Sequence, residues 1–377
     1  MILSIDGYEA NSGNRVGIGR FAYEMLTGIK TAVELGKSRF STVRVYMPDA
    51  PVDDLPIETA VWRYVVRRPK KLWTFIGLPW RLYKDKPRAD VVFSPTHYVP
   101  RFIGIPRVCS IMDVSYLHYP ELFTKKDLYQ LTTWTAYSVQ HCAKVITISE
   151  YSKHAIMEAY NLASDRVVVV YPGMSMSVKK KKIDNRQAPL TRYGIRTPYI
   201  LSVGTLQPRK NFVRLIEAFS KLEDTSLTLV IVGKKGWMYE EILAAPSVYG
   251  VKDRVKILDF VHDDDLATLY THAQCFVCPS LYEGFGLPVL EAMAYECPIV
   301  VSNVSSIPEI AGDAAIYVDP LRVTSITDGL TKSLSEHGSA EQKARIQVGK
   351  ERVSLFSWDT AAKQVLSVLE EVVSQVK

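Results

Sequence analysis

Short apolar runs rich in β-branched residues alternate along this chain with stretches of helical periodicity. In the first half, a helix is predicted from Gly19 to about Ile29. The predicted strands of this half are Ile2–Ile5, Thr42–Tyr46, Val91–Phe93, Arg107–Ile111 and Lys144–Ile148. Strands that alternate with helices are typical of a parallel sheet with helical crossovers. The first half therefore predicts one α/β domain.

The same alternation restarts after a polar interruption at residues 174–196, which contains the lysine run Lys179–Lys182. Helices are predicted at Phe212–Leu222 and Trp358–Val376. The predicted strands of this half are Tyr199–Val203, Leu227–Val232, Val255–Leu258, Cys275–Pro279 and Pro298–Ser302. The two halves look like two copies of one architecture, and 377 residues is a length typical of two domains.

We therefore predict an α/β fold of two Rossmann-like domains that face each other across a cleft. The expected divisions are an N-terminal domain over 1–175, a basic linker over 176–196, a C-terminal domain over 197–357 and a terminal helix over 358–377 that crosses back to the first domain.

Composition excludes disordered and membrane-spanning classes of protein. Apolar residues make up 47% of the chain and charged residues 23%, as in ordinary globular domains. No window approaches the roughly 18 apolar residues that a membrane-spanning helix needs. The N-terminus predicts a strand and a turn rather than a signal peptide. We expect a cytoplasmic protein whose membrane contact, if it has one, is peripheral on the inner face of the cytoplasmic membrane.

Two clusters have spacings that metal sites also use, but each has a simpler interpretation. Cys275 and Cys278 lie in an apolar run with no second pair, so we predict buried strand cysteines. His262 and the three aspartates that follow it precede a helical run, so we predict helix capping by Asp263 or Asp264. We expect no metal ion.

Positive charge is concentrated in residues 67–88, which we call the basic segment. It holds eight basic residues against one acid, a net charge of +7, whereas the whole chain carries +6. Trp73, Phe75, Trp80 and Tyr83 are interleaved with the charges. This combination suits an anionic membrane surface, into which Trp73 and Trp80 could insert. A solvated face with core aromatics is the main alternative, and we expect no nucleic-acid partner.

The strongest ligand-binding signal is Glu283-Gly-Phe-Gly-Leu-Pro-Val-Leu-Glu291, which follows a predicted strand as ligand sites of α/β sheets do. Pro288 fits the first turn of a helix, and Gly284 and Gly286 predict a tight turn before it. Amides at a helix N-terminus favour an anion. Carboxylates on both sides of such a cradle indicate a ligand with phosphate in the middle and hydroxyls on either side, as in a nucleotide sugar. A solvated loop acid and a capping acid would also explain the pair.

Two further loops follow predicted strands. Arg209 and Lys210 are adjacent cations that could neutralise a diphosphate, whose charge grows as it leaves. Two solvated cations at a helix entry are the alternative. Gly17 and Gly19 follow the first strand, but the third glycine of a dinucleotide fingerprint is missing. We interpret this stretch as a flexible loop at a strand end.

Together these stretches resemble glycosyltransferase family 4, whose members have the GT-B fold. The match is specific in residues 279–294 and continues through 302–309, 312–315, Asp319 and Pro320. Residues 203–211 and 232–237 also fit, as do Gly17–Arg20, Asp113 and residues 148–152. The resemblance covers nearly the whole chain and is greatest for bacterial mannosyltransferase-like members.

The resemblance implies that the N-terminal domain binds the acceptor and that the C-terminal domain binds the nucleotide sugar. It also implies roles for matching positions. Glu291 would hold the nucleotide ribose, Glu283 would contact the donor sugar, and Arg209 and Lys210 would contact the diphosphate. The implied donor-binding set is Gly17, Gly19, Thr205, Arg209, Lys210, Glu283, Gly284, Phe285, Gly286, Leu287 and Glu291. The implied catalytic set is Glu283, Arg209, Lys210 and Asp113.

The implied reaction is retaining transfer of a sugar to a glycan or lipid-linked glycan, without a cofactor or metal. The acceptor hydroxyl attacks on the face from which the nucleoside diphosphate leaves, and a departing phosphate oxygen takes its proton. GDP-mannose is the first choice of donor, ahead of a UDP-sugar. A nucleotide-sugar epimerase of the same fold is the alternative. A nicotinamide dehydrogenase is disfavoured by the incomplete glycine fingerprint.

Two positions depart from the family pattern. Many relatives carry His-Asp where this chain has Met112 and Asp113, which leaves an inactive binding module as a further alternative. His97 and His118 are the nearby candidates for the role of the missing histidine. Some relatives carry arginine where this chain has Thr205, so Arg209 is expected to supply that charge.

Overall fold

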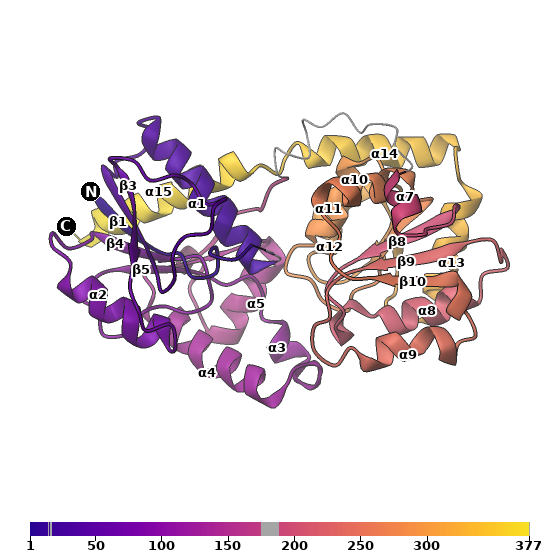
Figure 1. Ribbon diagram of the computed structural model, residues 1–377, viewed down its shortest axis with the longest axis horizontal. Coiled ribbons are helices and arrows are strands. Elements are labelled where there is room, and N and C mark those ends of the chain that lie inside the picture. Colours follow the sequence, from indigo (N-terminus) through magenta and orange to yellow (C-terminus); the bar gives the residue numbers. More distant parts are fainter. Residues whose placement is uncertain (14, 16, 175–187, 377) are drawn as a thin grey trace. The chain divides into compact units, whose positions relative to one another are not determined.

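The computed structural model describes residues 1–13, 15, 17–174 and 188–376 and forms two compact units (Figure 1). Unit 1 comprises Met1–His118, Lys125–Gly173 and Ser357–Lys377. Unit 2 comprises Tyr119–Thr124 and Met174–Phe356. No helix in the described part of the chain is long and apolar enough to cross a membrane.

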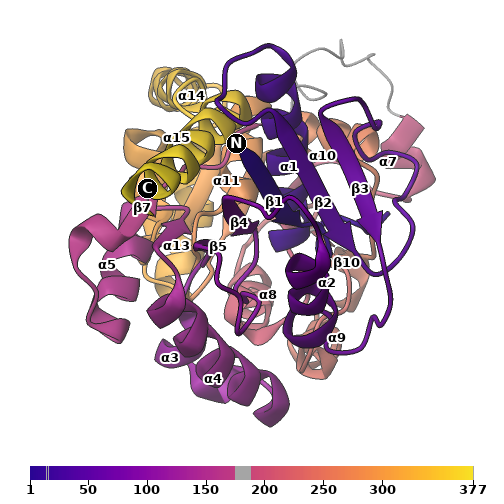
Figure 2. The same ribbon diagram turned by 90° about the vertical axis from the view of Figure 1, so that its left-hand side faces the viewer.

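Unit 1 is built on a parallel sheet of seven strands in the order β3-β2-β1-β4-β5-β6-β7 (Figure 2). The central strand β1 aligns Leu3 with Val43 of β2 on one side and with Val91 of β4 on the other. The strands are β1 Ile2–Asp6, β2 Thr42–Met47, β3 Trp62–Val66, β4 Val91–Ser94, β5 Arg107–Ser110, β6 Lys144–Thr147 and β7 Val167–Val169.

Five of these strands were predicted, but β3 and β7 were not. In β3 only Trp62 is buried, and β7 has three residues, so neither gives the buried apolar run that identifies an inner strand.

The helices of unit 1 include the predicted terminal helix α15, which packs against α1 (Figure 1). The rings of Phe21 and Trp358 meet edge to face at 6.0 Å. A Cβ at Gly28 would lie 2.5 Å from the Cβ of Ala362, so glycine permits the close approach of the two helices. The helices are α1 Ile18–Glu34, a π-helix Trp73–Gly77, α2 Leu78–Lys84, α3 Ser115–His118, α4 Lys125–His141, α5 Glu150–Tyr160 and α15 Trp358–Val376.

Unit 2 is built on a parallel sheet of six strands in the order β10-β9-β8-β11-β12-β13. The strands are β8 Tyr199–Val203, β9 Thr228–Val232, β10 Val255–Leu258, β11 Cys275–Cys278, β12 Ile299–Ser302 and β13 Ala315–Val318. The helices are α7 Ala188–Arg192, α8 Phe212–Ser220, α9 Glu240–Val248, α10 Asp263–His272, α11 Leu287–Ala294, α12 Ile307–Ala311, α13 Val323–Ser335 and α14 Ala340–Val353. Only β13 was not predicted, because its burial alternates.

Two local predictions need correction. The linker predicted at 176–196 is too long, because helix α7 and Tyr193 pack onto unit 2, where Arg192 and Tyr193 each donate to Asp265 at 2.8 Å. Its lysine run lies outside the described residues. The expected caps of α10 are also wrong, because His262 occupies the N-cap and the aspartates lie in the first turn. Carboxylates there still interact favourably with the helix dipole.

The cysteine prediction is confirmed. All five cysteines are free and buried. Burial raises the pKa of Cys275 to about 12. Among the described residues, no group of three or more His, Cys, Asp or Glu side chains is placed to hold a metal ion.

In each unit the order of the strands reverses beside its first strand, between β1 and β4 in unit 1 and between β8 and β11 in unit 2. Ligands of doubly wound sheets bind beyond the carboxyl ends of the strands at this switch point. Each unit therefore offers one such edge, and the loops that follow these four strands are the places to look for chemistry.

Candidate active site

The loop after β8 presents Arg209 and Lys210 on a single turn of 3₁₀-helix, Pro208–Lys210. Asn211 ends this turn in the left-handed conformation, with φ of 61°, and begins helix α8. Its side-chain amide donates to the carbonyls of Pro279 and Pro320 at 3.0 and 2.7 Å. Asn211 therefore ties the loop that carries both cations to the loops that follow β11 and β13.

The first part of the same loop, which holds Thr205, is braced by the loop after β9. Leu206 donates to the carbonyl of Lys234 at 2.8 Å, and Gly236 donates to the carbonyl of Leu206 at 3.0 Å. A Cβ at Gly233 would lie 1.9 Å from the carbonyl oxygen of Gly204, so only glycine fits there. The backbone beside Thr205 is thus fixed before any ligand binds.

The loop after β11 brings Glu283 to the two cations. Lys210 Nζ donates to Glu283 Oε1 at 2.6 Å, and Arg209 Nη1 lies 3.3 Å from Glu283 Oε2. Arg209 also donates to the carbonyl of Tyr282. The side chains of Arg209, Lys210 and Glu283 are only 14%, 11% and 7% exposed. The structure therefore assembles three of the predicted residues into one largely buried cluster at the switch point of unit 2.

The charge state of this cluster follows from its geometry. Burial alone would raise the pKa of the Glu283 carboxyl. The positive charges of Lys210 and Arg209, together with the Lys210 hydrogen bond, outweigh burial and lower the pKa to about 2. Glu283 is therefore ionised at neutral pH and balances one of the two positive charges beside it.

The turn before α11 has the predicted form. Gly286 has φ of 98° and forms the N-cap, and a Cβ there would lie 2.7 Å from Ile307 Cδ1. Glu283 N–H donates to Ser305 Oγ, and Ser306 Oγ donates to the Glu283 carbonyl, both at 2.9 Å. Phe285 is buried against Phe356, with ring centres 5.4 Å apart. Phe285 was a predicted donor contact, but its buried ring leaves only its backbone for such a contact. Gly284 and Phe285 precede the N-cap Gly286, and Leu287 is the first residue of α11.

Glu291 lies one turn inside α11 and is held by a residue of another helix. The hydroxyl of Tyr270 in α10 donates to Glu291 Oε2 at 3.0 Å. Tyr270 is buried, and its ring stacks on Tyr295 at 5.6 Å. The orientation of the Glu291 carboxylate is thus set by a tyrosine that stands outside every sequence motif.

The remaining predicted site residues belong to unit 1. Gly17 has φ of 51° and forms the N-cap of α1, and Gly19 lies in its first turn. Asp113 Oδ1 accepts from the backbone of Ser115 at 2.9 Å and so starts helix α3. Gly17 and Asp113 therefore lie on strand-end loops of unit 1, and Gly19 lies in the helix that follows the first of these loops, whereas the cation cluster and Glu291 lie in unit 2.

The residue that meets Met112 is His97. The backbone N–H of Met112 donates to His97 Nε2 at 3.3 Å, which requires that this nitrogen carry no proton. Burial lowers the pKa of His97, and the charge of Asp113 opposes that shift. His118 is instead the last residue of α3. Of the two candidate histidines, the structure brings His97 into contact with the Met112 backbone.

Sequence models of two families match the chain, one described as "Glycosyltransferase Family 4" over residues 33–178 and one as "Glycosyl transferases group 1" over residues 192–352. The chain belongs to glycosyltransferase family 4. One relative, the O-antigen chain mannosyltransferase B of Escherichia coli, is 28% identical over 370 residues, which cover 93% of this chain and 95% of the relative.

Solved structures share the fold of this family 4 glycosyltransferase. Sucrose-phosphate synthase from Thermosynechococcus elongatus has a TM-score of 0.77 at 16% identity, over 99% of both chains. HepE from Anabaena, solved in complex with UDP and glucose, has a TM-score of 0.72 at 16% identity, over 98% of this chain and 99% of its own. The two parallel α/β sheets are therefore those of the GT-B fold, as the resemblance implied.

Sequence reasoning missed the residues that support the site of this glycosyltransferase. Asn211 and Gly233 fix the loop of Arg209 and Lys210, and Tyr270 holds Glu291. The only sequence signal for Asn211 is its place directly after the two cations. The contact of Tyr270 joins residues 21 positions apart on two helices, and no local pattern predicts such a contact.

Proposed function

We propose that this glycosyltransferase moves a mannosyl group from GDP-mannose to a glycan or lipid-linked glycan, with retention of anomeric configuration. The observation that carries the proposal is the cluster of Arg209, Lys210 and Glu283 at the switch point of unit 2. The name of the relative from Escherichia coli supports mannose as the sugar. The UDP bound to the structural neighbour HepE supports a nucleotide-sugar donor as a class.

The cluster suits a donor in which a diphosphate joins a sugar. Arg209 and Lys210 together carry two positive charges, and Glu283 neutralises one of them before the donor binds. A diphosphate approaching these cations forms charge-assisted hydrogen bonds with them. Glu283 accepts hydrogen bonds from donor-sugar hydroxyls on the other side. One buried cluster thus binds the diphosphate and the sugar, the two groups joined by the bond that breaks.

The same cations favour the transition state over the ground state. Negative charge on the diphosphate increases as the glycosidic bond breaks, and preorganised cations stabilise that increase. The acceptor hydroxyl attacks on the face that the diphosphate leaves, and a phosphate oxygen receives its proton. The two side-chain cations do the work that a metal ion does elsewhere, so we expect activity in the presence of a chelator.

Nucleotide binding tests the placement of the donor. Glu291→Ala removes a carboxylate that accepts hydrogen bonds from two ribose hydroxyls, worth about 1.5–3 kcal/mol each. We expect the affinity for GDP to fall by about a hundredfold or more. Tyr270→Phe leaves the carboxylate in place without its 3.0 Å donor and should cause a smaller loss.

Calorimetry with GDP, UDP, ADP and dTDP measures these changes. The matched control is Tyr249→Phe, which removes a tyrosine hydroxyl bonded to Glu217 elsewhere in unit 2. If GDP binds Glu291→Ala as tightly as it binds the wild type, the ribose does not contact this residue.

We further propose that the basic segment contacts an anionic membrane surface. Its helical part buries Trp73, Leu78 and Leu82 in unit 1. The opposite face exposes apolar side chains at a spacing of three or four residues. These are Leu72, Ile76, Trp80 and Tyr83, which are 47%, 53%, 51% and 68% exposed. An exposed apolar stripe flanked by cations is typical of interfacial helices.

One expectation about this face is corrected by the structure. Trp73 was a candidate for insertion into the membrane, but it is only 3% exposed, and its indole N–H donates to Asp6 Oδ1 at 2.9 Å. Trp80 remains available, with Lys84 Nζ 4.3 Å from its ring centre. Insertion would therefore involve Trp80 rather than Trp73.

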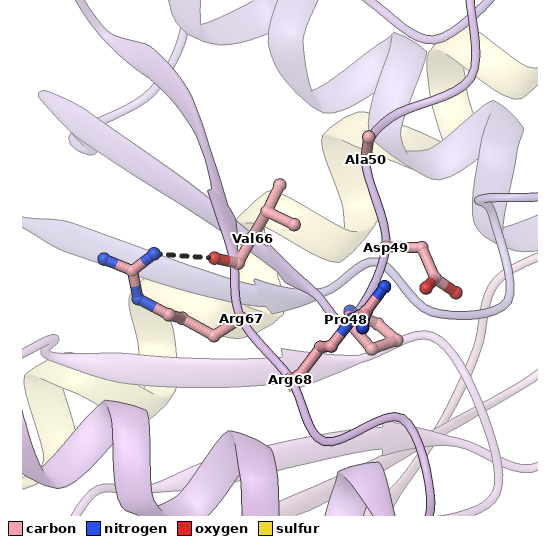
Figure 3. A pocket seen from close by; sticks show the side chains of 6 residues that line it. All are labelled: Pro48, Asp49, Ala50, Val66, Arg67 and Arg68. Carbon is pink, nitrogen blue, oxygen red and sulfur yellow. Dashed lines mark hydrogen bonds between the residues drawn. The ribbon is translucent and has the colours of Figure 1, made fainter.

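A pocket of about 320 Å³ opens beside the start of the basic segment, at the carboxyl ends of β2 and β3 (Figure 3). The exposed side chains of Arg67 and Arg68 line it, and Arg67 bonds the carbonyl of Val66. Asp49 also lines it but pairs with Lys70 at 2.8 Å. Cations thus outnumber acids at this pocket, which suits a lipid phosphate.

Vesicle sedimentation tests the membrane contact. Each basic residue near an anionic surface contributes about 1 kcal/mol, and the attraction decays over about 10 Å at 0.1 M salt. We expect the wild type to sediment with phosphatidylserine vesicles at low salt and to be released as salt is added. Changing Arg67, Arg68, Lys70 and Lys71 to serine should release the protein at low salt and leave GDP binding intact.

The matched control changes four exposed lysines of unit 2 to serine, at Lys221, Lys252, Lys332 and Lys343. It removes the same charge from the chain but leaves the basic segment whole, so it should sediment like the wild type. A wild type that stays in the supernatant at low salt means that this face is an ordinary solvated surface.

A further inference from the structure

The carboxyl edge of the unit 1 sheet carries an aromatic cluster that donor binding does not use. Phe75 comes from the π-helix after β3, Tyr98 from the loop after β4, and Trp134 from α4. The ring centre of Trp134 lies 4.7 Å from that of Phe75 and 5.4 Å from that of Tyr98. All three side chains are only partly buried. Three elements far apart in sequence thus present aromatic surface at one place.

An acidic residue, Glu9, stands on the loop after β1, at the same edge of the sheet. Burial raises the pKa of Glu9. Burial also raises the pKa of Tyr98 to about 12, and the negative charges of Glu9 and Asp127 contribute to that shift. Because Glu9 follows β1 and Tyr98 follows β4, the pair lies at the switch point of unit 1.

The polar groups of the cluster are available to a ligand. Within the part of the chain that the structure describes, no partner bonds the Glu9 carboxylate, the Tyr98 hydroxyl or the Trp134 indole N–H. Half-buried groups of this kind usually find a partner, in water or in a ligand. The cluster therefore offers aromatic surface together with one charged acceptor, one hydroxyl and one donor.

The cluster is also held in place by its surroundings. The Arg101 guanidinium lies 4.9 Å from the ring centre of Phe75 and 4.2 Å from that of Tyr137 in α4. His97, which accepts from Met112, meets the ring of Tyr98 edge to face at 6.3 Å. Val99 N–H donates to Ser138 Oγ at 3.2 Å. The loop after β4 is therefore fixed to α4 without a ligand.

We propose that Glu9, Tyr98 and Trp134, with Phe75, form the subsite that binds the acceptor sugar of this glycosyltransferase. A pyranose ring presents C–H groups on its faces and hydroxyls around its rim. Aromatic rings pack against the faces, while a carboxylate, a hydroxyl and an indole N–H bond the rim. This assignment rests on the proposed glycosyl transfer and adds the residues that recognise the acceptor.

The π-helix links this subsite to the basic segment. Within five residues, Trp73 turns into the core to bond Asp6, Phe75 joins the aromatic cluster, and Ile76 stands on the exposed apolar stripe. The acceptor is accordingly the sugar of a lipid-linked glycan, whose lipid lies at the stripe while its sugar lies at the cluster.

The test measures acceptor recognition separately from donor binding. We expect Glu9→Gln to raise the KM for a lipid extract from O-antigen-producing cells by about tenfold, because it removes a charge-assisted bond. Trp134→Ala should raise that KM further, and Trp134→Phe, which keeps an aromatic ring, should restore part of the loss. GDP affinity should stay within about twofold of the wild type in all three variants.

Two further measurements make the result decisive. Tyr129→Phe, an exposed tyrosine of α4 outside the cluster, is the matched control and should leave the KM unchanged. Saturation-transfer NMR with a mannose disaccharide shows whether the sugar binds without its lipid. Disaccharide binding that Glu9→Gln weakens supports recognition of the sugar alone, and transfer to the extract without disaccharide binding supports the lipid-linked form.

The assignment of the subsite is wrong if the wild type transfers mannose but both Glu9→Gln and Trp134→Ala have the KM of the wild type for the acceptor. That result leaves the proposed glycosyl transfer standing. The opposite failure, in which no nucleotide sugar binds and the disaccharide still binds at Glu9, overturns the proposed function instead.

Discussion

Replacing Lys210 by methionine will lower turnover by about a hundredfold or more and change donor affinity much less. Methionine keeps most of the length of the side chain but removes the charge that lies 2.6 Å from Glu283. Removing one preorganised electrostatic contact commonly costs a factor of about 10² to 10³ in turnover. The ground state loses less, because Arg209 remains and the diphosphate carries less charge before the bond breaks.

The measurement is the turnover number and the KM for GDP-mannose, at a temperature where circular dichroism shows the variant folded. Lys221→Met is the control, since the Lys221 side chain is exposed and pairs at 3.2 Å with Glu217, four residues earlier. Arg209→Ala should behave like Lys210→Met. If only the KM for donor rises in these variants, both cations act in ground-state binding and the argument from increasing charge is wrong.

Replacing Glu283 by glutamine will also lower turnover, but it will not weaken the binding of GDP. The substitution keeps the shape of the side chain but removes the negative charge that balances Arg209 and Lys210. We expect GDP to bind at least as tightly as to the wild type, because the cations no longer share their charge with a carboxylate. Turnover should fall by about a hundredfold, since the donor sugar loses a charged partner.

The pH dependence of stability gives this variant a second signature. The pKa of Glu283 is about 2 in the folded protein, below its ordinary value of 4.5. A lowered pKa stabilises the fold above pH 4.5, and that contribution, about 3 kcal/mol, is lost as the pH falls from 4.5 to 2. Glu283→Gln should therefore lose less stability than the wild type across this window. Equal acid sensitivity of the two proteins would mean that the cations do not hold the carboxylate ionised.

The elements that the sequence predicted well are those with continuous burial. Strands β8 and β11 are buried at almost every residue, so each appears in the sequence as a mostly apolar run. The polar residues that follow these runs could therefore be identified as site candidates. The sequence could predict that Arg209, Lys210 and Glu283 lie near one another, because their loops follow neighbouring strands at one edge of the sheet. Their mutual hydrogen bonds were not, because they join residues 73 and 74 positions apart.

The errors have local physical causes. Trp73 was a candidate for insertion into a membrane, but its ring is buried at the start of a π-helical turn, directly after the left-handed Leu72. The supporting contacts of Asn211 and Tyr270 depend on which loops the fold brings together. A sequence pattern indicates which residues are buried and where turns occur. It does not indicate which residues distant in sequence are in contact.

The most direct test of the account is sugar transfer by the purified protein. Labelled GDP-mannose and labelled UDP-glucose are incubated separately with the protein and a lipid extract, in the presence of EDTA. The label is then followed in the lipid fraction and in the free nucleotide sugars, and NMR determines the anomeric configuration of the product. We predict that mannose from GDP-mannose enters the lipid fraction in the α configuration of the donor and that GDP is released. Label that stays entirely in free nucleotide sugar of altered configuration would contradict glycosyl transfer and identify the chain as an epimerase.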